Sequence, residues 1–183
     1  AATPLPIVLY NVPGRTATDM LSETIARLSR VPGIVGVKEA SGDVERAVII
    51  ARDANPDFAI FSGDDGLTLP IMAIGGVGVI SVTGNVAPAT IAALTRAMRE
   101  GDLATARRIN LELVELNQAM FVETNPIPAK TALAMLGFGT GELRLPLTEA
   151  TTRTVETLNR ALRTVDETTA ALRVSRPEPR PTI

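Results

Sequence analysis

Four short apolar runs in the first half of the chain constrain its fold more than any other feature. They span residues 6–10, 34–38, 58–62 and 78–82, and each is rich in β-branched or aromatic side chains. Nearly continuous apolar runs of this kind are typical of parallel strands in a sheet that is covered on both faces. The runs end at residues 10, 38, 62 and 82, so the intervals of 28, 24 and 20 residues each accommodate a strand and a crossover helix. The pattern therefore predicts four βα units in series.

The segments between these runs predict the crossover helices. Apolar side chains recur in them at helical spacing, which gives each segment one apolar face. These faces consist of Leu21, Ile25 and Leu28; of Val44, Val48 and Ala51; and of Leu67, Ile71 and Ile74. We expect Pro32-Gly33, Asn55-Pro56 and Gly75-Gly76 to end the three helices, because these residues are typical helix terminators.

After Val82 the pattern becomes entirely helical. It predicts a helix around residues 91–98, a long helix over 103–121, a third from Pro126 to Gly137 and a fourth over 149–165. The apolar face expected on the long helix consists of Ala106, Ile109, Leu113, Leu116 and Met120. The chain is therefore predicted to be α/β, and four parallel strands fit either an open doubly wound sheet or half of an eight-stranded barrel. The near absence of residues before the first strand favours a chain that was cut at a loop.

Composition excludes several classes of function. The 18 basic and 20 acidic residues give a net charge of -2 and form no basic blocks, which argues against nucleic acid as a partner. The chain has no cysteine and no histidine, so thiol nucleophiles, zinc-thiolate sites and imidazole ligands are excluded. No apolar run reaches the roughly 18 residues of a membrane span, and no signal peptide is recognisable. We therefore expect a cytoplasmic protein without a metal or cofactor, in which carboxylates, lysine or tyrosine perform acid-base chemistry.

Lys38 is the first candidate catalytic residue. Only Lys38 and Lys130 among the 18 basic residues are lysines, whereas arginine fills every other basic position. A retained lysine is therefore expected to do what arginine cannot do, which is to lose its proton. Lys38 ends an apolar strand, where desolvation favours the neutral amine that attacks a carbonyl carbon and forms a Schiff base. The alternative is an amine that extends from a strand end to water, and for Lys130 a helix-surface position is an adequate explanation.

Tyr10 and Arg15 border the same edge of the predicted sheet, because active sites of parallel α/β folds form at the carboxyl ends of the strands. Tyr10 is the only tyrosine, and its phenol could relay a proton to a carbonyl adduct, or it could simply be a core aromatic residue. Arg15 lies in a Pro-Gly loop, where its planar guanidinium could bind a substrate carboxylate. The alternative for Arg15 is a solvated surface charge.

Asp64 and Asp65 follow the third predicted strand and support a different function. A carboxylate pair at this position could hold Mg²⁺ in a phosphate-processing enzyme. The alternative is that the pair caps the helix that begins near Leu67. One plausible ligand pair makes the magnesium hypothesis the weaker one.

Five segments together resemble the dihydrodipicolinate synthase family. They are YNVPGRT (10–16), GVKEASGD (36–43), FSGDD (61–65), GGVGVISVTGNVAP (75–88) and FVETNPIPAK (121–130). The resemblance covers residues 1–166. It implies a (β/α)8 TIM barrel with a C-terminal helical region, and the condensation of pyruvate with L-aspartate 4-semialdehyde to 4-hydroxy-tetrahydrodipicolinate in lysine biosynthesis.

The resemblance also implies roles for individual residues. Lys38 matches the lysine that forms a Schiff base with pyruvate, and Tyr10 matches the tyrosine that relays protons. Arg15 resembles the arginine near the site entrance that binds the semialdehyde carboxylate. Ile80 resembles the residue whose backbone lies beside bound pyruvate, with Gly63 close by. Pyruvate and the semialdehyde are the implied small-molecule partners, and the implied assembly is a homo-oligomer, either a tetramer or a dimer.

The departure from the family pattern is that about half of it is missing. Family members carry four more strands before the YNVPGRT segment, a Gly-Thr-Thr motif that binds the pyruvate carboxylate, and a second tyrosine donated across a dimer interface. We therefore expect a truncated chain that resembles the C-terminal half of the barrel. Residues 1–100 are predicted to form a half TIM barrel of four βα units, 101–173 a helical region and 174–183 a disordered tail.

Other functions stay open at this point. N-acetylneuraminate lyase and 2-keto-3-deoxy sugar-acid aldolases share the barrel and the lysine, although Arg15 favours an acceptor that carries a carboxylate. The chain could also be a catalytically silent half-barrel that serves as an assembly partner through its helices at 103–121 and 149–165.

Overall fold

The computed structural model describes residues 3–174, with side chains described as far as residue 164. The chain divides into two compact units. One unit consists of Ala1–Val82 with Leu94–Asn110, and the other of Thr83–Ala93 with Leu111–Ile183. Along the sequence, the chain changes from one unit to the other after residues 82, 93 and 110. The domain boundary that the sequence predicts at residue 100 stays a prediction.

The first unit contains a sheet of four parallel strands, which confirms the predicted βα series. The strands are β1 (Ile7–Asn11), β2 (Ile34–Glu39), β3 (Ala59–Ser62) and β4 (Gly78–Val79), and their spatial order equals their sequence order. Strand β4 is shorter than the apolar run at 78–82 because the chain leaves the ladder after Ile80. The Ile80 amide still donates to the Ser62 carbonyl at 2.9 Å, whereas the Val82 amide donates to the Asp65 carboxylate instead.

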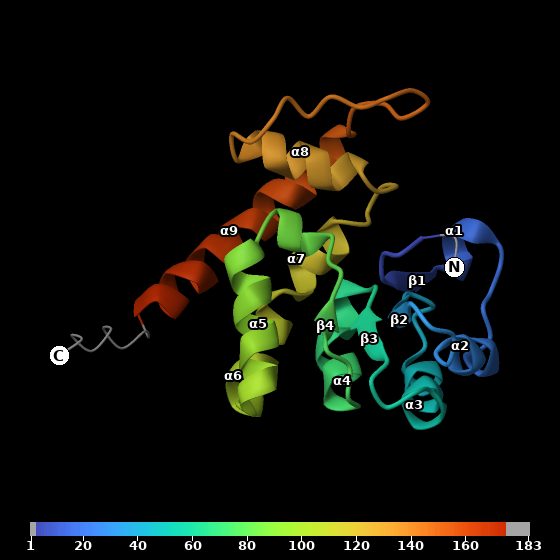
Figure 1. The fold of residues 1–183 in the computed structure, drawn as a ribbon. Helices are drawn as coiled ribbons and strands as arrows, with labels where there is room; N and C mark the ends of the chain where they lie inside the picture. The colour runs from blue at the N-terminus through green and yellow to red at the C-terminus, as the bar shows by residue number, and fades with distance from the viewer. Residues whose placement is uncertain (1–2, 175–183) are drawn as a thin grey trace. The chain divides into compact units, whose positions relative to one another are not determined.

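The short helix α1 (Pro13–Thr16) follows β1 and is drawn above it in Figure 1. The crossover helices α2 (Ser22–Leu28), α3 (Val44–Asp53) and α4 (Thr68–Ala73) are drawn below the strands, and the 3-10 turn η1 (Asp65–Leu67) precedes α4. Asp43 begins α3, because its carboxylate accepts hydrogen bonds from the amides of Glu45 and Arg46 at 2.9 and 3.3 Å.

The predicted apolar face of α3 is wrong. Ala47 and Ile50 are the buried residues of this helix, whereas Val48 and Ala51 are exposed. Both sets recur at helical spacing, so the periodicity alone did not distinguish them. The larger aliphatic side chain of Ile50 lies on the face that packs into the core.

The core of the first unit lies between the sheet and its helices. Val37 and Ile60 project from the strands and pack with Ile25, Ile50 and Ile71 from the helices. Successive strand residues point to opposite faces, so Tyr10 and Lys38 project away from this core. The predicted covering of both sheet faces is not observed on β1, because Tyr10 is 51% exposed.

Helices predominate in the rest of the described chain. They are η2 (Thr83–Asn85), α5 (Pro88–Glu100), α6 (Leu103–Glu112), α7 (Val114–Ala119), α8 (Ile127–Met135) and α9 (Thr152–Val174). The single long helix predicted over 103–121 is wrong, because α6 ends at Glu112 and α7 begins at Val114. Leu113 separates them with φ -79° and ψ -10°, a right-handed helical conformation whose ψ departs from the value of about -42° in a regular α-helix. The five residues predicted as its apolar face are all buried.

The helices predicted around 91–98, from Pro126 to Gly137 and over 149–165 are confirmed as α5, α8 and α9, with α9 starting three residues late. Within the second unit, α7 and α8 both contact α9. The disordered tail predicted at 174–183 falls, from residue 175 onward, outside the described residues. In the described part of the chain, no helix combines the length and the apolar character that crossing a bilayer requires.

Candidate active site

Tyr10 and Lys38 are neighbours across the first two strands. Parallel pairing places Tyr10 opposite Lys38 in β2, and Lys38 in turn opposite Phe61 in β3. The Lys38 Nζ atom lies 4.1 Å from the centroid of the Tyr10 ring, a distance at which an ammonium group is attracted to the ring face. Two residues that are 28 positions apart in the sequence therefore lie in contact at the carboxyl edge of the sheet.

The amine of Lys38 is accessible for chemistry. Its side chain is partly buried, and among the described residues its Nζ atom makes no hydrogen bond or ion pair. The Tyr10 hydroxyl also has no hydrogen-bond partner among them. An amine and a phenol that are not engaged elsewhere are both free to contact a bound carbonyl compound.

Gly63 packs directly against the stem of Lys38. A methyl group at position 63 would lie 2.5 Å from the Ala40 Cβ atom and 3.1 Å from the Lys38 Cγ atom. The Gly63 amide donates to the Glu39 carbonyl at 2.7 Å. The absence of a side chain at Gly63 is therefore what allows the end of β3 to approach the lysine closely.

Ile80 and Arg15 lie on the loops around this edge. The Ile80 backbone is fixed to the end of β3 through Ser62, as described above. Arg15 lies in α1, which follows β1 directly, and its side chain is exposed. Within the described part of the chain, no hydrogen bond, ion pair or ring contact joins Arg15 to Tyr10 or Lys38. The structure thus brings Tyr10, Lys38 and Gly63 together and leaves Arg15 on an adjacent loop.

The carboxylates of Asp64 and Asp65 each accept a hydrogen bond from a backbone amide. Asp64 caps η1 by accepting a hydrogen bond from the Gly66 amide at 3.0 Å. Asp65 is buried and accepts hydrogen bonds from the Ser81 hydroxyl and, at 2.9 Å, from the Val82 amide. The cap interpretation is therefore confirmed for Asp64, and both carboxylates are engaged by groups of this chain rather than pointing together at a shared site.

Two buried polar residues beside the candidate site were not predicted from the sequence. Asn11 follows Tyr10 and Glu39 follows Lys38, and both are buried on the opposite face of the sheet. The Asn11 amide group donates to both oxygens of the Glu39 carboxylate, at 3.1 and 3.3 Å. The signal that could have revealed them is a polar residue at the end of each apolar strand, in the position that faces the helices.

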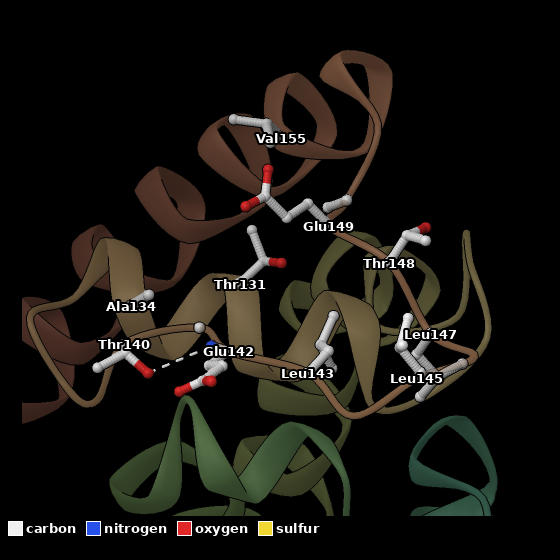
Figure 2. A pocket seen from close by; sticks show the side chains of 12 residues that line it. Thr131, Ala134, Thr140, Glu142, Leu143, Leu145, Leu147, Thr148, Glu149 and Val155 are labelled. Carbon is white, nitrogen blue, oxygen red and sulfur yellow. Dashed lines mark hydrogen bonds between the residues drawn. The ribbon is translucent and has the colours of Figure 1, made fainter.

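A cavity of about 750 Å³ lies in the second unit, away from these residues in sequence. It is lined by α8, the segment from Thr140 to Ala150 and the start of α9. Figure 2 shows the leucines of that segment at one end of the cavity, with Thr140 and Glu142 at the other. The charged residues that line it are Glu142 and Glu149, so it does not suit a small anionic substrate.

Comparison with known proteins identifies the family. Residues 1–165 match the family described as "Dihydrodipicolinate synthetase family". The chain belongs to this family. It is 51% identical over 159 residues to 4-hydroxy-tetrahydrodipicolinate synthase of Thermoanaerobacter sp. (strain X514), which covers 86% of this chain and 54% of the relative. The Pseudomonas aeruginosa enzyme of the same name is 49% identical over 162 residues, or 88% of this chain and 56% of the relative.

Solved structures of the dihydrodipicolinate synthetase family confirm the fold class. The Thermotoga maritima dihydrodipicolinate synthase superposes with a TM-score of 0.87 at 43% identity, covering 90% of this chain and 57% of that one. The enzyme of Methylacidiphilum fumariolicum SolV gives 0.90 at 41% identity, covering 94% and 58%. These neighbours are TIM barrels, so the four βα units correspond to part of such a barrel. The chain spans about half the length of the curated relatives it matches.

Proposed function

We propose that this chain carries the Schiff-base site of a pyruvate-dependent lyase. The enzyme would condense pyruvate with L-aspartate 4-semialdehyde to 4-hydroxy-tetrahydrodipicolinate, in the biosynthesis of lysine through diaminopimelate. The observation that carries this proposal is the contact between Lys38 and Tyr10 at the carboxyl edge of the sheet, in a chain about half identical to enzymes of that name.

The proposed chemistry begins at Lys38. Its neutral amine attacks the keto carbon of pyruvate, and a carbon-nitrogen bond forms while the carbonyl π electrons move to oxygen. The nitrogen loses one proton and the oxygen takes up two, so that water leaves and a protonated imine remains. Loss of a proton from the pyruvate methyl group then gives an enamine whose carbon attacks the aldehyde. Tyr10 would donate and accept these protons, and the contact between its ring and the Lys38 amine supports this role.

The remaining assigned residues would bind the substrates. Arg15 offers an exposed guanidinium without an internal partner in the described residues, which suits the carboxylate of the semialdehyde. Gly63 and the backbone at Ile80 would line the pyruvate position, since they adjoin Lys38 and the end of β3. We assign no cofactor or metal to this reaction, because an imine withdraws electrons from the keto carbon without one.

We further propose a cytoplasmic homo-oligomer, either a tetramer or a dimer. Membership of a family of biosynthetic enzymes supports the location, and the half-exposed sheet face at Tyr10 supports burial against further chain. One solved relative, 41% identical, is described as the first monomeric dihydrodipicolinate synthase variant, so assembly has to be measured for this chain.

The test of the proposed function is reductive trapping. Pyruvate followed by borohydride should attach a reduced pyruvate to Lys38, because only an imine is reduced to a stable amine. The reaction is run on this chain alone and on the chain mixed with the separately expressed first half of the Pseudomonas aeruginosa enzyme, and peptide mass spectrometry locates the adduct. Lys38→Arg should abolish trapping and Lys130→Arg should leave it unchanged. An adduct on Lys130, or no adduct in either preparation, would contradict the Schiff-base assignment.

A further inference from the structure

A polar cluster with two buried members, Asn11 and Glu39, lies at the base of the loop that carries Arg15. It consists of Asn11, Asp19, Glu39 and Arg46, which we call the Asn11 network. The members come from β1, from the segment before α2, from β2 and from α3. None of them has a role in the chemistry proposed above. The network lies on the helix-facing side of the sheet, opposite to Tyr10 and Lys38.

Asn11 joins the start of the loop between β1 and α2 to the end of that loop. Its carboxamide oxygen accepts a hydrogen bond from the Met20 amide at 3.0 Å, and its nitrogen donates to Asp19 at 3.2 Å. The same nitrogen donates to Glu39, whose carboxylate also accepts from the Ser41 amide at 2.8 Å. One side chain thus joins both ends of the loop to the second strand.

Arg46 fastens the far end of the loop to α3. One guanidinium nitrogen pairs with the Asp19 carboxylate at 2.6 Å, and another donates to the Met20 carbonyl at 2.9 Å. The Arg46 side chain is 16% exposed and the Asp19 side chain is 38% exposed, so solvent screens this pair in part. Planar recognition of two acceptors is a property that lysine does not share.

The loop itself has no apolar anchor. Helix α1 contains no buried residue, and every residue from Gly14 to Asp19 is exposed. Its position therefore depends on its polar contacts and on its own backbone, in contrast to the crossover helices that pack into the core. The Asn11 network supplies those contacts at the two residues where the loop joins the sheet and α2.

The network also touches the lysine strand. Glu39 follows Lys38 directly, and the Glu39 carbonyl accepts the Gly63 amide. The Arg46 Nε atom is buried and has no hydrogen-bond partner among the described protein groups.

We propose that Asn11, Asp19, Glu39 and Arg46 are positioning residues that hold Arg15 in place for the carboxylate of the second substrate. This inference rests on the proposed function for the identity of that substrate. The network acts on the acceptor step alone, because its hydrogen bonds fix the loop and leave the amine of Lys38 on the other face of the sheet. A network that only stabilised the fold would affect both steps equally.

The first test measures the loop in this chain by amide hydrogen exchange. Arg46→Lys keeps the charge and removes the two-acceptor geometry, so exchange at Thr16, Ala17 and Met20 should accelerate about tenfold or more while β2 amides keep their rates. The matched control is Arg52→Lys on the same helix, where the arginine pairs with Asp53 at the exposed surface. Unchanged exchange in the loop of Arg46→Lys would overturn the inference.

The second test separates positioning from stability by kinetics in the mixture with the Pseudomonas aeruginosa first half. Arg46→Lys and Asn11→Ala should raise the KM for the semialdehyde about tenfold and leave the rate of pyruvate trapping at Lys38 unchanged. In an Arg15→Ala background the same changes should add little, because the group they position is gone. Equal loss of both steps, or full additivity with Arg15→Ala, overturns the inference. If no variant and no wild-type mixture traps pyruvate, the proposed function fails and the exchange result alone decides about the loop.

Discussion

At the scale of single residues, the register of the parallel strands places Tyr10 beside Lys38 in the candidate site. Tyr10 and Lys38 were predicted to share an edge of the sheet, because the carboxyl ends of parallel strands lie together. Their contact was accessible from sequence for that reason alone. The Asn11 network could not be predicted from the sequence. Its two pairs, Asn11 with Glu39 and Asp19 with Arg46, come into contact only after the strands and α3 are packed.

Arg15→Ala tests the role of the exposed arginine. If Arg15 binds the acceptor carboxylate, removing a charge-assisted hydrogen-bonded contact should cost about 1.5 to 3 kcal/mol of transition-state stabilisation with the semialdehyde. Trapping of pyruvate at Lys38 should persist. The measurement is kcat/KM for each substrate in the mixture with the Pseudomonas aeruginosa first half, and equal damage to both substrates would assign Arg15 a structural role.

Gly63→Ala tests the close approach of β3 to the lysine. The added methyl group would meet the Ala40 Cβ atom at 2.5 Å and the Glu39 carbonyl oxygen at 3.0 Å, and neither can move without shifting backbone. Overpacking of this kind typically costs about 1 to 3 kcal/mol, which urea unfolding of this chain should detect. Gly66→Ala is the control, since its methyl group would meet only Asp64 Oδ1 at 3.5 Å. Similar losses for the two variants would contradict the packing argument.

At the scale of secondary-structure elements, Glu123 joins the segment after α7 to the start of α9. Its carboxylate accepts hydrogen bonds from the Thr154 hydroxyl, and from the Thr151 amide and hydroxyl, each of these two at 2.9 Å. These hydrogen bonds, with that from Thr154 the most important, lower the pKa of Glu123 below its ordinary value. The carboxylate therefore satisfies donors at a helix N-terminus, where a negative charge is also favoured by the helix dipole.

The lowered pKa of Glu123 predicts how stability depends on pH. A carboxyl group with a lower pKa in the folded state than in the unfolded state contributes stability above its unfolded value, and that contribution declines as pH falls through the folded value. Thermal unfolding should therefore show that Glu123→Gln destabilises the chain near neutral pH, and that the difference from wild type shrinks below about pH 4.5. Glu156→Gln, on the exposed side of α9, should show no comparable difference. A Glu123→Gln effect that grows on acidification would contradict the assignment.

Element identity was more predictable than the details of how elements end and turn. The strand runs and most helices were recognisable because apolar periodicity reflects burial directly. The errors at α3 and at Leu113 have local causes, since α3 offers two faces of similar periodicity and Leu113 interrupts a helix without proline or glycine. Strand β4 ends early because the Val82 amide donates its hydrogen bond to Asp65, which lies 17 residues earlier in the chain. A hydrogen bond between residues so far apart leaves no pattern in the sequence.

At the scale of the whole molecule, the decisive fact is that the chain spans about half of its curated relatives. Within the described sheet, β1 pairs only with β2 and β4 pairs only with β3, so both outer strands have unpaired edges. Tyr10 is 51% exposed and Val8 is 41% exposed on the face that carries Lys38. An open site of this kind leaves the amine in contact with water, which weakens every electrostatic interaction that would favour imine formation.

We therefore predict that the 183-residue chain alone has little or no synthase activity. Lys38, Tyr10 and Arg15 are present, but the sequence contains no Gly-Thr-Thr motif and only one tyrosine, whereas the family resemblance implies that both the motif and a second tyrosine take part. Loss of general acid-base assistance typically reduces a rate by about 100- to 10,000-fold.

A coupled assay measures the synthase activity of the isolated chain, and of the chain mixed with the first half of the Pseudomonas aeruginosa enzyme. Recovery only on mixing would support an active site divided between two half-barrels, whereas a silent assembly partner would stay inactive in both. Activity of the isolated chain near that of a complete enzyme would contradict the prediction, because Lys38 and its neighbours would then suffice without enclosure.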